Sequence, residues 1–343
     1  MFDGEEGRDV GDLTMQALRS ASNWSLGKRN TECSIYECYL ELIDKAEHFI
    51  YIENQFFISS TSGAGVENRI VKALCVRIIR AIQENKPFKV VVFMPLMPAF
   101  EANLEDHQGK VMQIQIGLQN TTIGKGENSL IEMVRKNLDG KGINHEEYIM
   151  ICSLRKFERR PSDGKPITEL IYIHSKLMIV DDKRLIIGSA NINDRSMLGS
   201  RDSELAVCIE GRDSQQVQSD SGPVGVVNKI HEFRKALFKE HFGFDVEFPA
   251  LKKTWDELWQ IAKTNTAIYS KVFRIYPSDE YSNWGALQTR EKLFDAFGFD
   301  TLTPNLKGHA VLYPYLFLKE ENLLEEAKNS ELSLMVVPIY ALF

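Results

Sequence analysis

The chain has 343 residues, of which 43% are hydrophobic and 26% charged, and it carries a formal net charge of −7 at pH 7. This balance is typical of a globular protein with a large core. The negative charge argues against a general nucleic-acid-binding protein, which usually has a basic face, although a local basic pocket is compatible with it. Five cysteines, an odd number, favour free buried thiols in a reducing compartment over a disulfide scaffold.

Hydrophobic periodicity predicts alternating helices and strands in the first part of the chain. Residues 1–30 are polar and are predicted to be irregular. A helix is expected from Ser34, and further elements follow as a strand at 49–52, a helix at 66–82 and a strand at 88–93. This strand–helix–strand order favours a parallel pair joined by a helical crossover.

Residues 97–128 are predicted to form a long connection, and residues 211–224 an exposed loop, because both are rich in small and polar residues. A helix is expected at 130–138, strands at 148–152, 168–173, 177–180, 185–188 and 205–209, and helices along 226–237 and 255–262. We therefore expect an α/β sandwich: one lobe over 31–343, with its central strands at 168–210 and a helical extension over 224–343. No apolar run approaches the ~20 residues of a bilayer-spanning helix.

The most informative segment reads H-x-K-x4-D, followed by G-S-x-N. It places His174, Lys176 and Asp181 before a turn that contains Ser189 and Asn191. Alternate side chains of a strand point to the same side, so the imidazole of His174 and the ammonium of Lys176 can converge on one phosphate. The lysine would neutralise phosphate oxygens, and the histidine would act as nucleophile or general acid.

The turn adds a hydroxyl and an amide, from Ser189 and Asn191, that can hydrogen-bond to a phosphate oxygen. With charge supplied by lysine and histidine, such a site can work without a metal, and no cysteine–histidine cluster has the spacing of zinc ligands. We therefore expect no metal and no other cofactor. The remaining histidines lack this context and are expected to have surface or packing roles; they are His48, His107, His145, His231, His241 and His309.

A second polar group follows the strand predicted at 49–52. Glu53, Asn54, Gln55 and Phe56 could form the lip of a pocket in which Glu53 and an aromatic ring face a quaternary ammonium. The alternative is that Phe56 belongs to the core and that Glu53 is a surface or salt-bridged residue.

The H-x-K-x4-D and G-S-x-N segments resemble the signature of the phospholipase D superfamily. The stretches I-Y-I-E-N-Q-F-F from Ile50 and I-G-S-A-N-I-N-D-R-S from Ile187 resemble the C-terminal half of the catalytic region of its eukaryotic members. The resemblance implies that Glu204 supports His174 and that Asp181 is a structural partner fixing strand and turn. It also implies hydrolysis of phosphatidylcholine to phosphatidic acid and choline through a phosphohistidine, with transfer to alcohols, by a cytoplasmic protein at the periphery of intracellular or plasma membranes.

The superfamily builds one active site from two copies of the motif, and this chain contains one. The resemblance therefore implies a partner, either a missing N-terminal catalytic half or a second copy of the chain, with His174 as the general acid. Two alternatives stay open: an inert lipid-binding or regulatory remnant, and a homodimeric phosphodiesterase acting on nucleic acid. The net negative charge disfavours the second, so no nucleic acid is expected as a partner.

Overall fold

A computed structural model describes residues 8–10, 13–27, 30–63, 65–99, 103–105, 109–212, 214–290 and 296–328. The strands are β1 (Arg8–Val10), β2 (Leu13–Ala21), β3 (Glu32–Cys33), β4 (Phe49–Asn54), β5 (Lys89–Phe93), β6 (Ile149–Arg159), β7 (Pro166–Ile171), β8 (Lys176–Val180), β9 (Arg184–Gly188), β10 (Glu204–Gly211), β11 (Gln215–Ser219), β12 (Gly222–Val226) and β13 (Ala310–Leu312). The helices are α1 (Asn23–Leu26), α2 (Ser34–Lys45), α3 (Ile70–Glu84), α4 (Lys110–Ile123), α5 (Leu130–Leu138), α6 (Asp194–Met197), α7 (Asn228–Phe242), α8 (Lys252–Phe273), α9 (Trp284–Gln288), α10 (Ala296–Leu302) and α11 (Leu323–Lys328).

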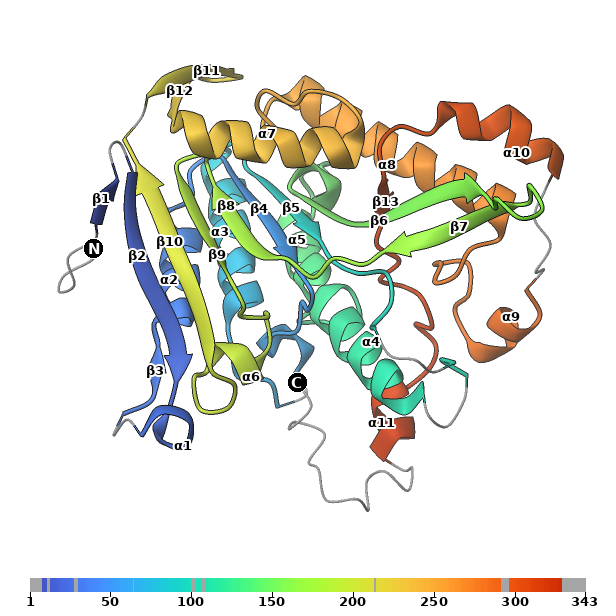
Figure 1. The fold of residues 1–343 in the computed structure, drawn as a ribbon, viewed down its shortest axis with the longest axis horizontal. Helices are drawn as coiled ribbons and strands as arrows, with labels where there is room; N and C mark the ends of the chain where they lie inside the picture. Colours follow the sequence, from blue (N-terminus) through green and yellow to red (C-terminus); the bar gives the residue numbers. More distant parts are fainter. Residues whose placement is uncertain are drawn as a thin grey trace.

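One mixed sheet organises the molecule, with the strand order β1-β2-β10-β9-β8-β4-β5-β6-β13 (Figure 1). Strands β4, β5 and β6 are parallel neighbours, whereas β8, β9, β10 and β2 continue the sheet in antiparallel steps. Helix α3 connects β4 to the adjacent parallel strand β5, which confirms the predicted crossover. Strands β11 and β12 form a separate two-stranded sheet.

Helices cover both faces of the central strands, which confirms the expected α/β sandwich. All six residues of β4 are buried, and their side chains alternate between two cores. Ile50 and Ile52 pack in the core that includes residues of α2, α3 and α5. Phe49 and Tyr51 pack on the other side, in the core that includes residues of α7 and α8. This burial on both faces explains why the strand reads as a continuous apolar run.

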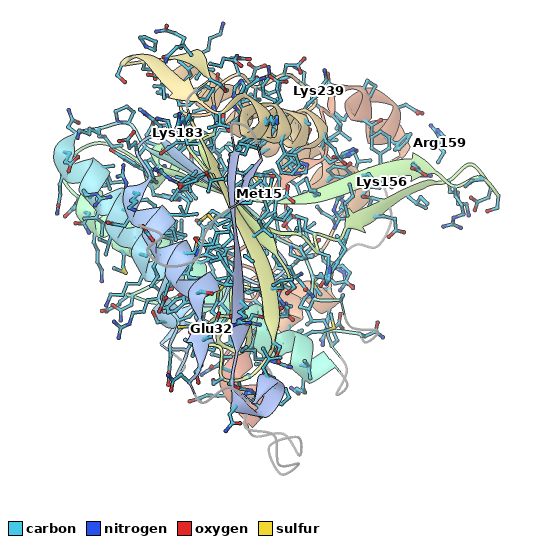
Figure 2. All side chains as sticks on the ribbon, turned by 60° about the vertical axis from the view of Figure 1, so that its left-hand side comes forward. Met15, Glu32, Lys156, Arg159, Lys183 and Lys239 are labelled. Atoms are coloured by element: carbon cyan, nitrogen blue, oxygen red, sulfur yellow. The ribbon has the colours of Figure 1, made fainter. Side chains whose placement is uncertain are left out.

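Strand β6 continues beyond its pairing with β5 and forms an antiparallel hairpin with β7. The hairpin projects from the body of the molecule, and Lys156 and Arg159 mark its outer part in Figure 2. Strand β7 ends at Ile171, directly before the segment that contains His174. The hairpin therefore leads directly into the segment that contains the motif.

The N-terminal segment expected to be irregular instead holds a nine-residue strand, β2, and the short helix α1. Strand β2 pairs with β10 from Leu13 to Ser20. Its exposure does not alternate regularly: on one face Leu13 packs in the α7-side core while Ala17 and Arg19 are exposed, and on the other face Leu18 is buried while Thr14 is exposed. The period-two signal of a half-buried strand is therefore weak in this sequence.

Two further segments differ from expectation. The long connection 97–128 contains α4, whose glutamines and asparagines are buried along with its apolar residues, so no polar face reveals a helical period. The predicted loop 211–224 contains the hairpin of β11 and β12, in which glycine and glutamine residues mask the strand pattern. Among the helices in the described part of the chain, none has the length and apolar character needed to cross a bilayer.

Candidate active site

The motif residues gather at one edge of the sheet. Strand β8 begins where β4 ends, since Lys176 is paired with Asn54. Strand β9 returns to the same edge, and Gly188 at its end is paired with Ala206 near the start of β10. Because these strands alternate in direction, the H-x-K segment, the G-S-x-N turn and Glu204 all lie at this edge (Figure 1).

His174 lies in the short connection between β7 and β8 and is exposed. The ring of Tyr172 stacks on it at a centroid distance of 6.3 Å and an interplanar angle of 28°. The Tyr172 hydroxyl accepts a hydrogen bond of 2.9 Å from Nε2 of Gln55, which follows β4. The histidine thus faces solvent beside an aromatic ring that is itself anchored to the sheet.

Lys176 is the first residue of β8, and it is 7% exposed. Its Nζ donates to Oε1 of Gln55 at 3.0 Å and to the backbone oxygen of His174 at 2.6 Å. Burial lowers the pKa of Lys176 to about 8, and the negative charge of Glu204 opposes that shift. The ammonium of Lys176, together with burial, lowers the pKa of His174, so the imidazole is mostly neutral at pH 7 when no anion is bound.

The G-S-x-N turn is fastened to the end of β4 by Asn54. The Asn54 amide donates to the backbone oxygen of Ala190 at 3.4 Å and accepts from the backbone N–H of Ile192 at 3.1 Å. Before the turn, a Cβ on Gly188 would lie 2.3 Å from a backbone oxygen of β10, so the close approach of β9 and β10 requires glycine there. The side-chain oxygen of Asn191 is buried without a hydrogen-bond partner among the described residues, and an asparagine amide can present either its oxygen or its nitrogen at such a position.

Glu204 binds two serines. One of its oxygens accepts a hydrogen bond from the Ser189 hydroxyl and the other from the Ser196 hydroxyl at 2.6 Å. No hydrogen bond between described residues joins Glu204 to His174, and the support of His174 by Glu204 stays a prediction. Strand β9 lies between β8 and β10, and two inter-strand steps amount to about 10 Å. Glu204 therefore orients the turn, and its charge acts on Lys176.

Asp181 lies at the far end of β8 from His174, and it is 1% exposed. Its carboxylate accepts hydrogen bonds from three consecutive backbone N–H groups that lead into β4, those of Glu47 and His48 at 2.7 Å and of Phe49 at 2.8 Å. Its backbone is left-handed, with φ 55°. This geometry is that of the structural partner implied by the resemblance.

The expected head-group pocket is only partly compatible with the structure. Glu53 is 6% exposed and Asn54 is fully buried, so neither forms an open lip. Glu53 points to the α7 side of β4, away from Lys176, because Glu53 is paired with Leu177 and shares that residue's face. Gln55 contacts Lys176, and Phe56 is partly buried against a small apolar cluster.

Sequence reasoning missed several side chains that support this edge. Ser196, in the short helix α6, is buried and binds Glu204, but a serine in a polar stretch carries no distinguishing signal. His231 and His241, expected only in surface or packing roles, are buried on α7 and contact carboxylates of Asp182 and Glu53. His107 lies outside the described residues.

The comparisons with known proteins agree with one another. The family model described as phospholipase D matches residues 13–170 and 168–273. The chain is 37% identical over 331 residues to phospholipase D1 of Mus musculus and 44% identical over 276 residues to phospholipase D zeta 1 of Arabidopsis thaliana. These matches cover 92% and 77% of this chain but only 30% and 24% of the relatives, so the chain spans less than a third of their length.

Among solved structures, the phospholipase D family member Nuc from Salmonella typhimurium is 15% identical, with a TM-score of 0.30, over 72% of this chain and 95% of that one. NucT from Helicobacter pylori is 13% identical, with a TM-score of 0.29, over 57% of this chain and 86% of that one. Both structural likenesses are weak, and the sequence matches are the stronger finding.

Proposed function

Because the chain belongs to the phospholipase D family, we propose that it supplies one of the two catalytic motifs of an enzyme that hydrolyses phosphatidylcholine to phosphatidic acid and choline. The observation that carries the proposal is the pairing at the sheet edge. A solvent-facing imidazole, His174, is followed two residues later by Lys176, a buried ammonium close enough to lower its pKa.

In the proposed reaction, the histidine of a second motif attacks phosphorus and forms an N–P bond while the P–O bond to choline breaks. His174 gives its proton to the choline oxygen. It then takes a proton from water, which opens the phosphohistidine and releases phosphatidic acid; an alcohol in place of water gives a phosphatidyl alcohol. A bound phosphodiester anion offsets the charge of Lys176, so substrate binding favours the protonated His174 that this acid role needs.

The groups around this pair have supporting roles in the proposal. Lys176 neutralises phosphate oxygens, and the turn presents Ser189 and Asn191 to them. The Ser189 hydroxyl donates to Glu204, so it binds the phosphate only when its proton turns from that carboxylate. Asn191 binds the phosphate through its N–H₂ group, in the amide orientation that exchanges the unpartnered oxygen for the nitrogen. The hydrogen bond that the Lys176 ammonium donates to Gln55 fixes the position of that ammonium.

The second motif would come from an N-terminal catalytic half that packs beside the site at the membrane surface. The sheet face opposite α2 carries an open apolar patch, made by Ala17, Ile187, Leu205 and Val207, which the strand registers place on one side of β2, β9 and β10. Leu205 is 63% and Ile187 40% exposed, and none of the helices among the described residues covers this face in Figure 1. The patch adjoins the site, since Leu205 follows Glu204 and its N–H donates to Ser189.

The test is co-expression of this chain with the N-terminal catalytic half of a full-length relative. We expect choline release from phosphatidylcholine vesicles, and phosphatidylethanol when ethanol is present, from the complex but not from the chain alone. Choline release from a purified monomer would contradict the two-motif reading. Activity of a pure dimer of this chain would show instead that a second copy supplies the motif.

The same preparations separate the alternative functions. Nicking of supercoiled DNA without choline release would identify a nuclease-type phosphodiesterase. Binding of the chain to vesicles, with no turnover in any pairing, would identify a lipid-binding remnant.

A further inference from the structure

A buried hydrogen-bond network lies directly behind the motif, on the α7 side of β4. The Glu53 carboxylate accepts hydrogen bonds from the hydroxyls of Tyr51 and Ser175 and contacts Nε2 of His241 at 2.8 Å. Glu53 and His241 are 6% and 4% exposed. Ser175 takes part because it lies between His174 and Lys176 in sequence, so its side chain points to the opposite face of the sheet.

Glu53 is suited to hold these donors as a charged acceptor. Burial alone would raise the pKa of Glu53, but the hydrogen bonds from His241, Ser175 and Tyr51 outweigh it and lower the pKa. An ionised carboxylate only accepts hydrogen bonds, so Nε2 of His241 carries a proton in this contact. Hydrogen bonds to a charged acceptor are the stronger kind, particularly away from water.

Apart from Ile173, which packs in the α7-side core, few contacts hold the catalytic segment. Residues 172–175 belong to no strand, and among the described residues none of their backbone groups takes part in a backbone–backbone hydrogen bond. Side chains do the holding: Gln55 binds the Tyr172 hydroxyl, Lys176 binds the His174 oxygen, and Glu53 binds the Ser175 hydroxyl. Of these hydrogen bonds, only that of Ser175 comes from the face away from the site, the face on which Ile173 packs.

We propose that Glu53 and His241 are positioning residues that hold Ser175 and thereby fix His174 beside Lys176. The inference rests on the proposed function of that pair and adds to it a support on α7, more than sixty residues along the chain from the motif. Neither residue faces the phosphate site; both act through Ser175.

The same helix offers a matched control. His231, ten residues before His241, is also buried, and its Nδ1 lies 2.7 Å from the carboxylate of Asp182, which Arg234 binds as well. Asp182 directly follows Asp181 at the far end of β8. The His231 pair thus fastens α7 to the turn after β8, and the His241 pair fastens it to the end of β4, at the opposite end of the paired strands β4 and β8. Only the His241 pair reaches the catalytic segment.

The experiment is a pH titration of the His174 imidazole by NMR on the ¹⁵N-histidine-labelled chain, with its signals assigned by their loss in His174→Asn. In the wild type, Lys176 holds the pKa of His174 below its ordinary value. We expect Ser175→Ala and His241→Asn to raise that pKa, because the segment loosens and the ammonium moves away. Ser175→Thr, which keeps the hydroxyl, and His231→Asn should titrate as the wild type does.

The titration of His174 does not depend on catalytic turnover. A failure of choline release would therefore reject the proposed reaction and leave the titration interpretable. A wild-type titration of His174 in Ser175→Ala overturns the inference, as does an ordinary histidine pKa in the wild type itself. An equal shift in Ser175→Thr or in His231→Asn would assign the effect to general loosening and also overturn it. Should His241→Asn fail to fold, Ser175→Ala, which removes a single hydroxyl, carries the test alone.

Discussion

At the scale of single residues, the candidate site depends on one solvent-facing imidazole. Replacing His174 by Asn keeps a polar side chain but removes the group that exchanges protons, so we expect activity of the assembled enzyme to fall by about 10³-fold. Choline release at saturating phosphatidylcholine measures this. His309→Asn is the control, because the described contact of His309 with α7 uses its backbone N–H. Turnover of His174→Asn within tenfold of wild type would refute the assignment.

The buried ammonium of Lys176 predicts a pH dependence of anion binding. Its pKa of about 8 means that the side chain is charged below this pH and neutral above it. Binding of dimethyl phosphate, which stays a monoanion throughout this range, should therefore weaken as pH rises from 7 to 9. Calorimetric titration of the wild type and of Lys176→Met tests this, and we expect the variant to bind weakly at every pH. Equal wild-type affinity at pH 7 and pH 9 would show that this charge does not hold the anion.

At the scale of secondary-structure elements, the sequence predicted what periodicity can reveal. Helix α5 was expected at 130–138 and spans Leu130–Leu138, and the strands of the motif region lie where the apolar runs predicted them. Helix α4 was missed because burial of polar residues such as Gln113 and Asn120 erases the amphipathic pattern. Those side chains are satisfied by backbone carbonyls of Leu104 and Phe317, and such distant partners leave no local signal.

In the candidate site, too, some features were predicted from the sequence and others were not. The pairing of His174 with Lys176 was predicted from strand geometry, although His174 lies in the connection before β8 and only Lys176 is in a strand. The partners of Glu53 and Glu204 were not, because they depend on which strands are neighbours and on where α7 lies. Glu53 looked like a pocket residue, yet its register with Leu177 turns it away from the phosphate site.

Asp181 provides a test of how β8 and β4 are joined. Asp181→Ala leaves three backbone N–H groups without their acceptor and places alanine at a positive φ, so we expect a loss of about 3 kcal/mol in the free energy of unfolding. Asp181→Asn keeps one acceptor oxygen and tolerates the left-handed backbone, so its loss should be smaller. Urea denaturation measures both.

The control for this test is Asp256→Ala, which removes an exposed partner of Lys252 and should change stability by less than about 0.5 kcal/mol. If Asp181→Ala were as stable as this control, the carboxylate would not be what fastens the two strands.

At the scale of the whole molecule, the sheet is covered unevenly. Helices cover both faces of its centre, whereas in the described part of the chain the β2–β10–β9 region has a helix on one face only (Figure 1). Its open face carries the apolar patch of Ala17, Ile187, Leu205 and Val207, with the exposed Arg19 beside Leu205, and this patch lies next to the site. The chain spans less than a third of the length of its relatives. Exposed apolar patches of this kind mark interaction surfaces, and in the proposed function a second motif completes the site. The position of the patch and the chemistry of the site therefore both favour the N-terminal catalytic half as the partner.

A charge placed on that face tests the docking directly. Leu205→Glu should leave the isolated chain folded, because Leu205 is 63% exposed, but it should prevent association with the N-terminal half and so abolish the restored choline release. Val76→Glu is the matched control: Val76 is 54% exposed on α3, away from the open face, and the same charge there should change neither association nor activity. Co-purification and choline release are measured for both variants, with circular dichroism to verify folding. Full association of Leu205→Glu would place the second half on another surface, whereas a loss in both variants would mean that added charge, not its position, disrupts the complex.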